Sequence, residues 1–390
     1  MVSNLPKSKF ATRAIHAGQS PDPTTGAIMT PIYASSTFVQ DSPGVHKGYE
    51  YARTGNPTRK AYEMCMANLE VGNSAYAFAS GLAAADTVLS LLDSGDHILA
   101  MDDLYGGSRR LFDNVRKRTS NLRFVFGDLS KPEVVEKLIS EKIKMIWIET
   151  PTNPMLKIVD LKYITDLAKQ HNIITVADNT FSSPYIQRPI ENGFDIVVHS
   201  ATKYLNGHSD MVGGVVVCSH KKHGEQIAYL QNAVGAVQGP FDAFLALRGL
   251  KTLSLRMEKH CSNAMQVALF LKSHDLIDNV YYPGLEDHPG HSIAKRQMNG
   301  YGGIVTCVIK GGLDSSKRFL ETCQIFQLAE SLGGVESLIE HPGIMTHASV
   351  PENVRNELGI KDGLVRLSVG IEDIDDLLLD LERALFAAKD

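Results

Sequence analysis

Hydrophobic and polar positions alternate in blocks along the chain from about residue 60 onward. Short apolar runs bounded by polar residues or glycine are typical of buried strands, whereas longer stretches with apolar residues every three or four positions are typical of helices. Helical patterns at 81–92, 132–140 and 161–170 separate several of the runs. The predicted strands are 76–79, 97–101, 123–126, 145–149, 174–177, 196–198 and 214–217. Strands that alternate with helices predict an α/β fold in which a mostly parallel seven-stranded sheet lies between helices.

A second, smaller set of elements occupies the C-terminal part of the chain. A long helical pattern covers about 241–274, and Pro283-Gly284 follows it. The remaining predicted elements are strands at 304–309 and 364–369, a helix near 315–323 and a closing amphipathic helix at 373–388. Because 390 residues exceed one ordinary core, we predict a large domain over 61–255 and a smaller C-terminal α/β domain over 256–390.

The first 60 residues differ from the rest of the chain. They are rich in Pro, Gly, Ser and Thr and show neither helical nor strand periodicity. A segment of this length without regular structure is uncommon unless it is disordered or functional. It carries aromatic and basic side chains, among them Tyr51 and Arg53. We therefore predict an N-terminal arm over residues 1–60 that is ordered against a neighbouring subunit.

The composition is that of an ordinary globular protein, with 43% hydrophobic and 21% charged residues. A net charge of −5 gives no support for a nucleic-acid partner or an anionic membrane partner. The chain has no apolar stretch of about 18 residues and no apolar segment behind the N-terminal lysines. We therefore predict neither a membrane span nor a signal peptide.

The cysteines and histidines show no pattern of a disulfide framework or a metal site. The five cysteines are scattered without a C-x-x-C pair, and the fourteen histidines form no H-E-x-x-H motif. Scattered free cysteines are typical of a reducing compartment, so we predict a cytoplasmic protein without a metal.

Polar residues stand at the ends of three predicted strands. Glu149 ends one strand, Asp178 directly follows another, and Ser200 follows a third. The carboxyl ends of parallel strands meet at one edge of the sheet, where ligands bind in open α/β sheets. We expect a binding site at this edge.

The run Ser200-Ala201-Thr202-Lys203 combines two hydroxyls and one amine. Because side chains alternate along extended backbone, Ser200 and Thr202 can bind an anion while Lys203 reaches a different atom. The carboxylate of Asp178 can pair with a ring nitrogen. Pyridoxal 5′-phosphate (PLP) has a phosphate, an aldehyde and a pyridine nitrogen, and proteins hold it through a lysine and an acidic partner. Alternatively, Lys203 is a surface lysine beside a turn and Asp178 caps a turn or helix.

Other segments can add contacts to a phosphate. Gly81 and Leu82 open a predicted helix directly after a strand, so that backbone N–H groups face an anion along the helix dipole. Many helices begin with a Ser-Gly pair, so this signal is weak by itself. Tyr51 and Arg53 can supply a charged clamp.

Five further residues are candidates for contacts with the ring or with a substrate. Tyr105 lies on a glycine loop and either stacks on a flat cofactor and protonates a leaving group or is a packed loop tyrosine. Asn153, between two prolines, either donates to the cofactor's phenolic oxygen or forms an Asx turn. Arg366 lies inside an apolar strand and is either exposed at a sheet edge or bound to a buried partner, for which a bidentate amino-acid carboxylate is suitable. Glu330, followed by Ser331, either contacts a substrate ammonium or is exposed.

In type and order, these residues resemble the Cys/Met-metabolism family of PLP-dependent enzymes, which have fold type I. The clearest similarity is in Asp178-Asn179-Thr180-Phe181 and in residues 198–208. Residues 149–154 and 345–348 add to it, and the agreement extends from about Thr12 to the final helix.

The resemblance implies a role for each candidate residue. Lys203 is then the lysine that holds PLP covalently, Asp178 the partner of the pyridine nitrogen and Tyr105 the residue stacked on the ring. The family places Gly81, Ser200 and Thr202 on the phosphate and Arg366 on the substrate carboxylate. It also implies that Tyr51 and Arg53 reach the phosphate of a neighbouring subunit, within a homotetramer built from two dimers.

Within the family the chain is most similar to cystathionine γ-lyases and γ-synthases, because Glu330 precedes Ser331-Leu332-Gly333-Gly334. Methionine γ-lyases typically have cysteine where this chain has Gly107. We predict γ-elimination of L-cystathionine to L-cysteine, 2-oxobutanoate and ammonia, with γ-synthase or β-lyase activity as alternatives. A nucleotide-binding oxidoreductase would share the parallel sheet, but no G-x-G-x-x-G follows an early strand.

Overall fold

The large sheet is the centre of the fold, in a computed structural model that describes residues 8–348 and 350–389. It has seven strands, and only β7 runs antiparallel to its neighbours. In spatial order the strands are β1 (Ser74–Phe78), β7 (Gly214–Cys218), β6 (Ile196–Ser200), β5 (Ile174–Asp178), β4 (Ile143–Glu149), β2 (His97–Met101) and β3 (Arg123–Gly127). The predicted mostly parallel sheet is confirmed.

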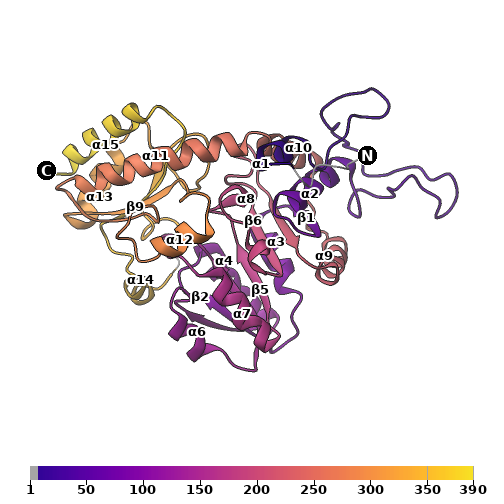
Figure 1. The fold of residues 1–390 in the computed structure, drawn as a ribbon, viewed down its shortest axis with the longest axis horizontal. Helices are drawn as coiled ribbons and strands as arrows, with labels where there is room; N and C mark the ends of the chain where they lie inside the picture. Colours follow the sequence, from indigo (N-terminus) through magenta and orange to yellow (C-terminus); the bar gives the residue numbers. More distant parts are fainter. Residues whose placement is uncertain (1–7, 349, 390) are drawn as a thin grey trace.

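Helices cover both faces of the large sheet (Figure 1). They are α2 (Pro57–Leu69), α3 (Gly81–Leu89), α4 (Gly106–Arg110), α5 (Lys117–Thr119), α6 (Pro132–Leu138), α7 (Leu161–His171), α8 (Ser183–Ile186), α9 (Lys221–Val234) and α10 (Pro240–Leu250). A π-helical turn at Leu111–Arg116 joins α4 to α5, and a 3₁₀ turn covers Pro189–Asn192. Two apolar cores result: one includes Trp147 and Val88, and the other includes Tyr62 and Leu247. Since both faces are covered, the strands are nearly continuous apolar runs.

A smaller sheet of five strands lies at the other end of the molecule. Its spatial order is β10 (Gln327–Leu328), β11 (Leu338–Glu340), β12 (Leu364–Ser368), β9 (Ile304–Ile309) and β8 (Ile277–Tyr281). The helices around it are α11 (Leu253–Ser273), α12 (His291–Gln297), α13 (Gly312–Thr322), α14 (Glu352–Leu358) and α15 (Ile374–Ala388). A third apolar core, with Phe319, Leu367 and Leu381, joins this sheet to its helices.

The long helical pattern predicted at 241–274 is two helices in the structure. Residues 251 and 252 separate α10 from α11, and α11 then runs along the top of the molecule in Figure 1. Because α11 packs on α1 and α8 as well as on β8 and β9, it connects the two sheets. The domain boundary that we place after residue 255 therefore falls inside α11 and stays a prediction.

The N-terminal segment is less uniform than its composition indicates. The expectation that residues 1–60 lack regular structure is wrong for α1 (Phe10–His16) and for the start of α2 at Pro57. A proline at the first helical position and the Asn56 side chain, which accepts hydrogen bonds from the N–H groups of Thr58 and Arg59, begin α2. Between α1 and α2 the described chain extends away from the body as long loops, at the right of Figure 1.

Candidate active site

A cavity of about 310 Å³ lies beyond the carboxyl ends of β4, β5 and β6 and extends to residues of the small-sheet region. Every candidate residue of the sequence lines it except Tyr51 and Arg53. The candidates in the lining are Gly81, Leu82, Tyr105, Asn153, Asp178, Ser200, Thr202, Lys203, Glu330, Ser331 and Arg366. The fold thus brings together residues that are distributed over most of the chain.

Lys203 lies three residues after the end of β6. Its Nζ donates a hydrogen bond to the Ser331 hydroxyl at 2.6 Å. Burial, together with the positive charge of Arg366, lowers the pKa of Lys203 to about 8. About a tenth of the amine is therefore neutral, and hence nucleophilic, at pH 7, which is far more than for an ordinary lysine.

Asp178 is the last residue of β5 and is held by the residue two positions later. Its Oδ1 accepts hydrogen bonds from the Thr180 N–H at 3.1 Å and the Thr180 hydroxyl at 2.5 Å. The Thr180 hydroxyl oxygen also accepts the Ser200 N–H at 2.9 Å, which ties β5 to the end of β6. Burial raises the pKa of Asp178, and the hydrogen bonds from Thr180 oppose the rise. Thr180 carries no local signal of this role in the sequence.

Glu149 ends β4 opposite Asp178 in the strand register and also lines the cavity. Its Oε2 accepts the backbone N–H of Tyr105 at 3.0 Å. Burial first, and then the neighbouring charge of Asp178, raise the pKa of Glu149 well above its usual range. Two adjacent carboxyl groups do not both ionise readily in a buried site, so the proton resides preferentially on Glu149. Asp178 is then free to carry the negative charge.

One end of the cavity offers hydroxyls and backbone amides rather than charged groups. Ser80 caps α3 by accepting the Ala83 N–H at 3.0 Å, and the first turn of α3 borders the cavity. A Cβ on Gly81 would lie 2.9 Å from the Ser200 Cβ, so only glycine lets α3 approach β6 this closely. The Thr202 hydroxyl accepts the Gly213 N–H at 3.1 Å. We call Ser80, Gly81, Ser200 and Thr202 the Gly81 end.

The opposite end is built around a buried arginine. Arg366, in the middle of β12, is 2% exposed, and its Nη1 lies 2.8 Å from the Glu340 Oε1. The same Nη1 donates to the Asn153 Oδ1 at 2.8 Å, and Nη2 donates to the Ser331 carbonyl at 2.9 Å. We call Asn153, Ser331, Glu340 and Arg366 the Arg366 end. Glu340 was missed in the sequence analysis, because it faces Arg366 only through the pairing of β11 with β12.

Tyr105 directly precedes α4 at the border of the cavity and is 40% exposed. Burial of part of its ring raises the pKa of Tyr105, so the phenol keeps its proton at neutral pH. A Cβ on Gly107 would lie 2.3 Å from the Tyr105 Cε1. The absence of a side chain at Gly107 therefore leaves the space that the Tyr105 ring occupies.

Tyr51 and Arg53 lie away from the cavity of their own chain. Tyr51 is 46% exposed, and the Arg53 guanidinium lies over its ring, 5.6 Å from the centroid. Arg53 Nε donates to the Asn232 Oδ1 at 3.2 Å, which holds this part of the arm against α9.

A model of the family described as "Cys/Met metabolism PLP-dependent enzyme" matches residues 11–386. The chain belongs to this family. PLP is therefore its cofactor, as the sequence predicted, and the predicted family and fold type are confirmed.

Its relatives carry three different activities in their names. A cystathionine β-lyase of Coxiella burnetii is 61% identical over 98% of this chain and 100% of its own length. A cystathionine γ-synthase of Mycobacterium tuberculosis is 52% identical, with 96% of each chain covered. A crystal structure of cystathionine γ-lyase from Lactobacillus plantarum with L-serine has a TM-score of 0.95 and 49% identity, covering 98% of this chain and 99% of that one.

The residues of the cavity fit PLP. Lys203 supplies a buried amine of lowered pKa for the aldehyde, and Asp178 supplies a carboxylate for the pyridine nitrogen. The Gly81 end supplies hydroxyls and the N-terminus of α3 for a phosphate. A Cβ at Gly81 would collide with Ser200, so glycine is needed for α3 and Ser200 to lie this close together. Within residues 8–348 and 350–389, no group of three or more His, Cys, Asp or Glu side chains could hold a metal ion. None of the helices in the same part of the chain is both long and apolar enough to cross a membrane.

Proposed function

We propose that this protein cleaves L-cystathionine by γ-elimination and, with the uptake of one water, gives L-cysteine, 2-oxobutanoate and ammonia, with PLP held by Lys203. The observation that carries the proposal is the position of Lys203 Nζ, 2.6 Å from the Ser331 hydroxyl, in a cavity that Arg366 and Tyr105 also line. This arrangement supplies an amine, a carboxylate-binding cation and a phenol in one enclosed space.

Arg366 binds the α-carboxylate of the amino-acid substrate in this proposal. The guanidinium is fixed by Glu340, Asn153 and the Ser331 carbonyl, so that little conformational freedom is lost when a carboxylate arrives. Glu330 borders the same cavity and is suited to the second ammonium of cystathionine. Such positioning supplies much of the rate enhancement before any proton moves.

Three side chains handle protons. Bound PLP supplies an electron sink for negative charge at the substrate α-carbon. Asp178 keeps the proton on the pyridine nitrogen, while Lys203 removes the α-proton and carries protons between the substrate carbons. Tyr105, whose raised pKa keeps it protonated, donates to the departing sulfur on Cγ. Each positioned proton transfer contributes roughly 10²- to 10⁴-fold.

Cystathionine β-lyase activity is the second candidate, since the Coxiella burnetii relative at 61% identity bears that name. β-Elimination uses the same α-proton abstraction, but it breaks the bond on the other side of the sulfur. The products are then homocysteine, pyruvate and ammonia. γ-Synthase activity needs the same residues and an activated homoserine ester, so it is the third outcome to test.

The test is a product analysis with purified holoenzyme. L-Cystathionine alone is supplied first, and the 2-oxo acid is identified by mass spectrometry. We expect 2-oxobutanoate with cysteine; pyruvate with homocysteine would replace the proposal by β-elimination. A second reaction with cysteine and O-succinyl- or O-acetylhomoserine measures synthesis, and a faster rate there than in cleavage would assign the chain as a synthase.

We also propose that the arm completes the cavity of a second copy within a homotetramer built from two dimers. Tyr51 and Arg53 lie outside their own cavity, and the arm exposes large apolar side chains, with Val39 90% and Ile28 85% exposed. Co-expression of Lys203→Ala and Arg53→Ala chains tests this arrangement. If the arm completes the neighbouring cavity, each mixed dimer contains one intact site of two. Because random assortment makes about half of the dimers mixed, the co-expressed population should recover roughly a quarter of wild-type activity. Recovery of none, or a monomer by light scattering, would contradict it.

A further inference from the structure

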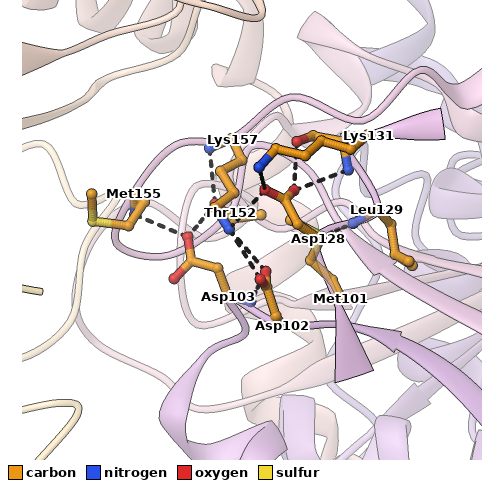
Figure 2. A network of polar contacts seen from close by, with 10 residues as sticks. Met101, Asp102, Asp103, Asp128, Leu129, Lys131, Thr152, Met155 and Lys157 are labelled. Carbon is orange, nitrogen blue, oxygen red and sulfur yellow. Dashed lines mark hydrogen bonds and ion pairs between the residues drawn. The ribbon is translucent and has the colours of Figure 1, made fainter. Parts of the chain in front are cut away.

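Behind the cavity wall lies a polar cluster that the proposed reaction does not use. It contains Asp102 and Asp103 after β2, Asp128 after β3, and Thr152 and Lys157 in the loop after β4 (Figure 2). None of these side chains lines the cavity. The cluster joins the loop that carries Tyr105 to the loop that carries Asn153.

Asp103 is the centre of this connection. It is completely buried, and its Oδ2 accepts hydrogen bonds from the Thr152 hydroxyl and from the Met155 N–H, the latter at 3.1 Å. Those two donors lie on either side of Asn153 in the sequence. Asp103 itself precedes Tyr105 by two residues. One carboxylate oxygen therefore holds both flanks of the Asn153 turn against the loop that presents Tyr105.

The Thr152 hydroxyl is used fully. It donates to Asp103 and accepts the Lys157 N–H at 2.9 Å, while the Thr152 N–H donates to the Lys157 carbonyl at 3.1 Å. The loop is thus closed on itself, and the Thr152 hydroxyl is the side-chain group that attaches it to Asp103, beside the Met155 N–H. Figure 2 shows Thr152 between Asp103 and Lys157.

The groups around Asp103 act on its pKa in both directions. Burial, and to a smaller extent the charge of Asp102, raise the pKa of Asp103 to about 6, whereas the Thr152 hydroxyl, the Lys157 ammonium and the Met155 N–H oppose the rise. Lys157 Nζ lies 3.0 Å from Asp102 and 3.3 Å from Asp128, so its positive charge is shared at the outer side of the cluster. An ionised Asp103 accepts from both donors and has no proton of its own to compete with them.

A second contact joins the same two loops nearer the cavity. The Tyr105 N–H donates to Glu149 at the end of β4, while Asn153 accepts from Arg366. Loss of the Asp103 contacts would leave the two loops joined by the Tyr105–Glu149 hydrogen bond and by the Lys157–Asp102 ion pair on the outer side of the cluster. Neither contact holds the residues that flank Asn153 directly, so Tyr105 and Asn153 could move relative to each other. Displacements of about 1 Å in such residues can cost about 10²-fold in rate.

We propose that Asp103, acting through Thr152, is the positioning residue that sets the distance between Tyr105 and Asn153 across the cavity. The inference rests on PLP as the cofactor and on the cavity, and it holds for cleavage and for synthesis alike. Its spectroscopic test needs no substrate. The product analysis would therefore show a failure of the proposed γ-elimination, while the dichroism would report on Asp103 independently of it.

The sharpest test compares Thr152→Val with Thr152→Ser in the holoenzyme. Valine keeps the branched shape and removes the hydroxyl, whereas serine keeps the hydroxyl. With L-cystathionine we expect kcat to fall by about 10- to 100-fold for Thr152→Val, and by less than about threefold for Thr152→Ser. The visible circular dichroism of bound PLP should change for the valine variant only, because Tyr105 borders the cofactor's cavity.

Asp103→Asn and Asp103→Leu separate hydrogen bonding from charge. The Asp103 Oδ1 has no hydrogen-bond partner within the described part of the chain, so the asparagine amide group can occupy that position while its oxygen accepts from Thr152 and Met155. We expect Asp103→Asn to keep most of the dichroism and Asp103→Leu to lose it. If Asp103→Leu does not fold, the Thr152 pair still decides the question.

Lys131→Ala is the matched control at the edge of the same cluster. The Lys131 side chain is 58% exposed and approaches Asp128 only to 3.5 Å, so its removal should leave the dichroism and kinetics unchanged. Wild-type dichroism and kcat in Thr152→Val would overturn the proposal. So would equal losses in the valine, serine and Lys131 variants, or a lowered melting temperature with kcat unchanged.

Discussion

The two ends of the cavity are made in different ways. The Gly81 end consists of hydroxyls and backbone amides from α3 and from the residues at and just after the end of β6, all within the large-sheet region. The Arg366 end is a buried ion pair with amide and carbonyl partners, assembled from β11, β12 and two loops. The Gly81 end depends on the close approach of α3 to the end of β6, whereas the Arg366 end depends on the pairing of the buried Arg366 charge with Glu340. Changes of volume should therefore damage the first end, and changes of charge should damage the second.

Lys203 lines the cavity together with both ends. Without its amine, neither the PLP phosphate contacts of the Gly81 end nor the carboxylate contacts of the Arg366 end can lead to turnover. We expect Lys203→Ala to lack the visible absorption of enzyme-bound PLP and to lose turnover by about 10⁴-fold or more. Absorption spectra and a coupled 2-oxo-acid assay measure these two effects. A lysine-free variant that keeps both the colour and the activity would refute the assignment.

The next largest effect should come from the Arg366 end. Arg366→Ala leaves Glu340 buried without its partner, and breaking a buried pair typically costs about 3–5 kcal/mol. We expect kcat/KM to fall by about 10²- to 10³-fold, mainly through KM, because the substrate carboxylate loses its cation. PLP affinity, measured by titration of absorbance, should change little. If Arg366→Ala lost PLP binding and kept its KM for the amino acid, the assignment of the substrate carboxylate to the Arg366 end would be wrong.

The pH dependence of PLP uptake reports on the amine between the ends. Because the pKa of Lys203 is about 8, the neutral fraction of the amine grows about tenfold per pH unit below 8 and levels off above it. Stopped-flow absorbance of apo-protein mixed with PLP should follow this profile. Arg366→Ala removes a positive charge that lowers the pKa of Lys203, so the midpoint should move upward. A flat profile between pH 6 and 9 would contradict a buried amine of lowered pKa.

The smallest effect should be a loss of volume at the Gly81 end. A methyl group at Gly81 meets the Ser200 Cβ at 2.9 Å, so Gly81→Ala should separate α3 from β6 slightly. We expect roughly three- to tenfold weaker PLP binding with a nearly unchanged KM for amino acid, since overpacking costs about 1–3 kcal/mol before relaxation. Gly239→Ala is the control, because its added Cβ approaches no atom closer than 3.8 Å. Equal effects of the two substitutions would show that Gly81 has no special contact.

Much of the large sheet could be predicted because its strands are local apolar runs. His97–Met101 of the large sheet has in the structure the bounds that the pattern indicates, and so does Ile304–Ile309 of the small sheet. The short strand β11 and the exposed, charged β8 carry no such run and could not be predicted from the pattern. Their pairing depends on β9 and β12, which lie beside them only after the chain has folded.

The residues of the site also divide into those with a local signal in the sequence and those that depend on a distant partner. Lys203 and Asp178 were found because a lysine after a Ser-x-Thr run and an acid at a strand end are local signals. Glu340 and Thr180 were not found, since each acts through a partner side chain. The Asp103 contact to Thr152 is of this second kind, and a pair of aspartates before a tyrosine gives no indication of which one is buried.

The sequence by itself determined the family, the cofactor, the mostly parallel sheet and the residue types at the strand ends. Only the tertiary structure decided that Ser331 meets Lys203 across 128 positions and that Asn153 meets Arg366 across 213. Secondary structure and ligand motifs depend on residues that are close in the sequence, because the backbone sets the relative geometry of such residues. The partner of a buried charge is set by how separate elements pack, because burial makes compensation necessary without specifying which distant residue supplies it.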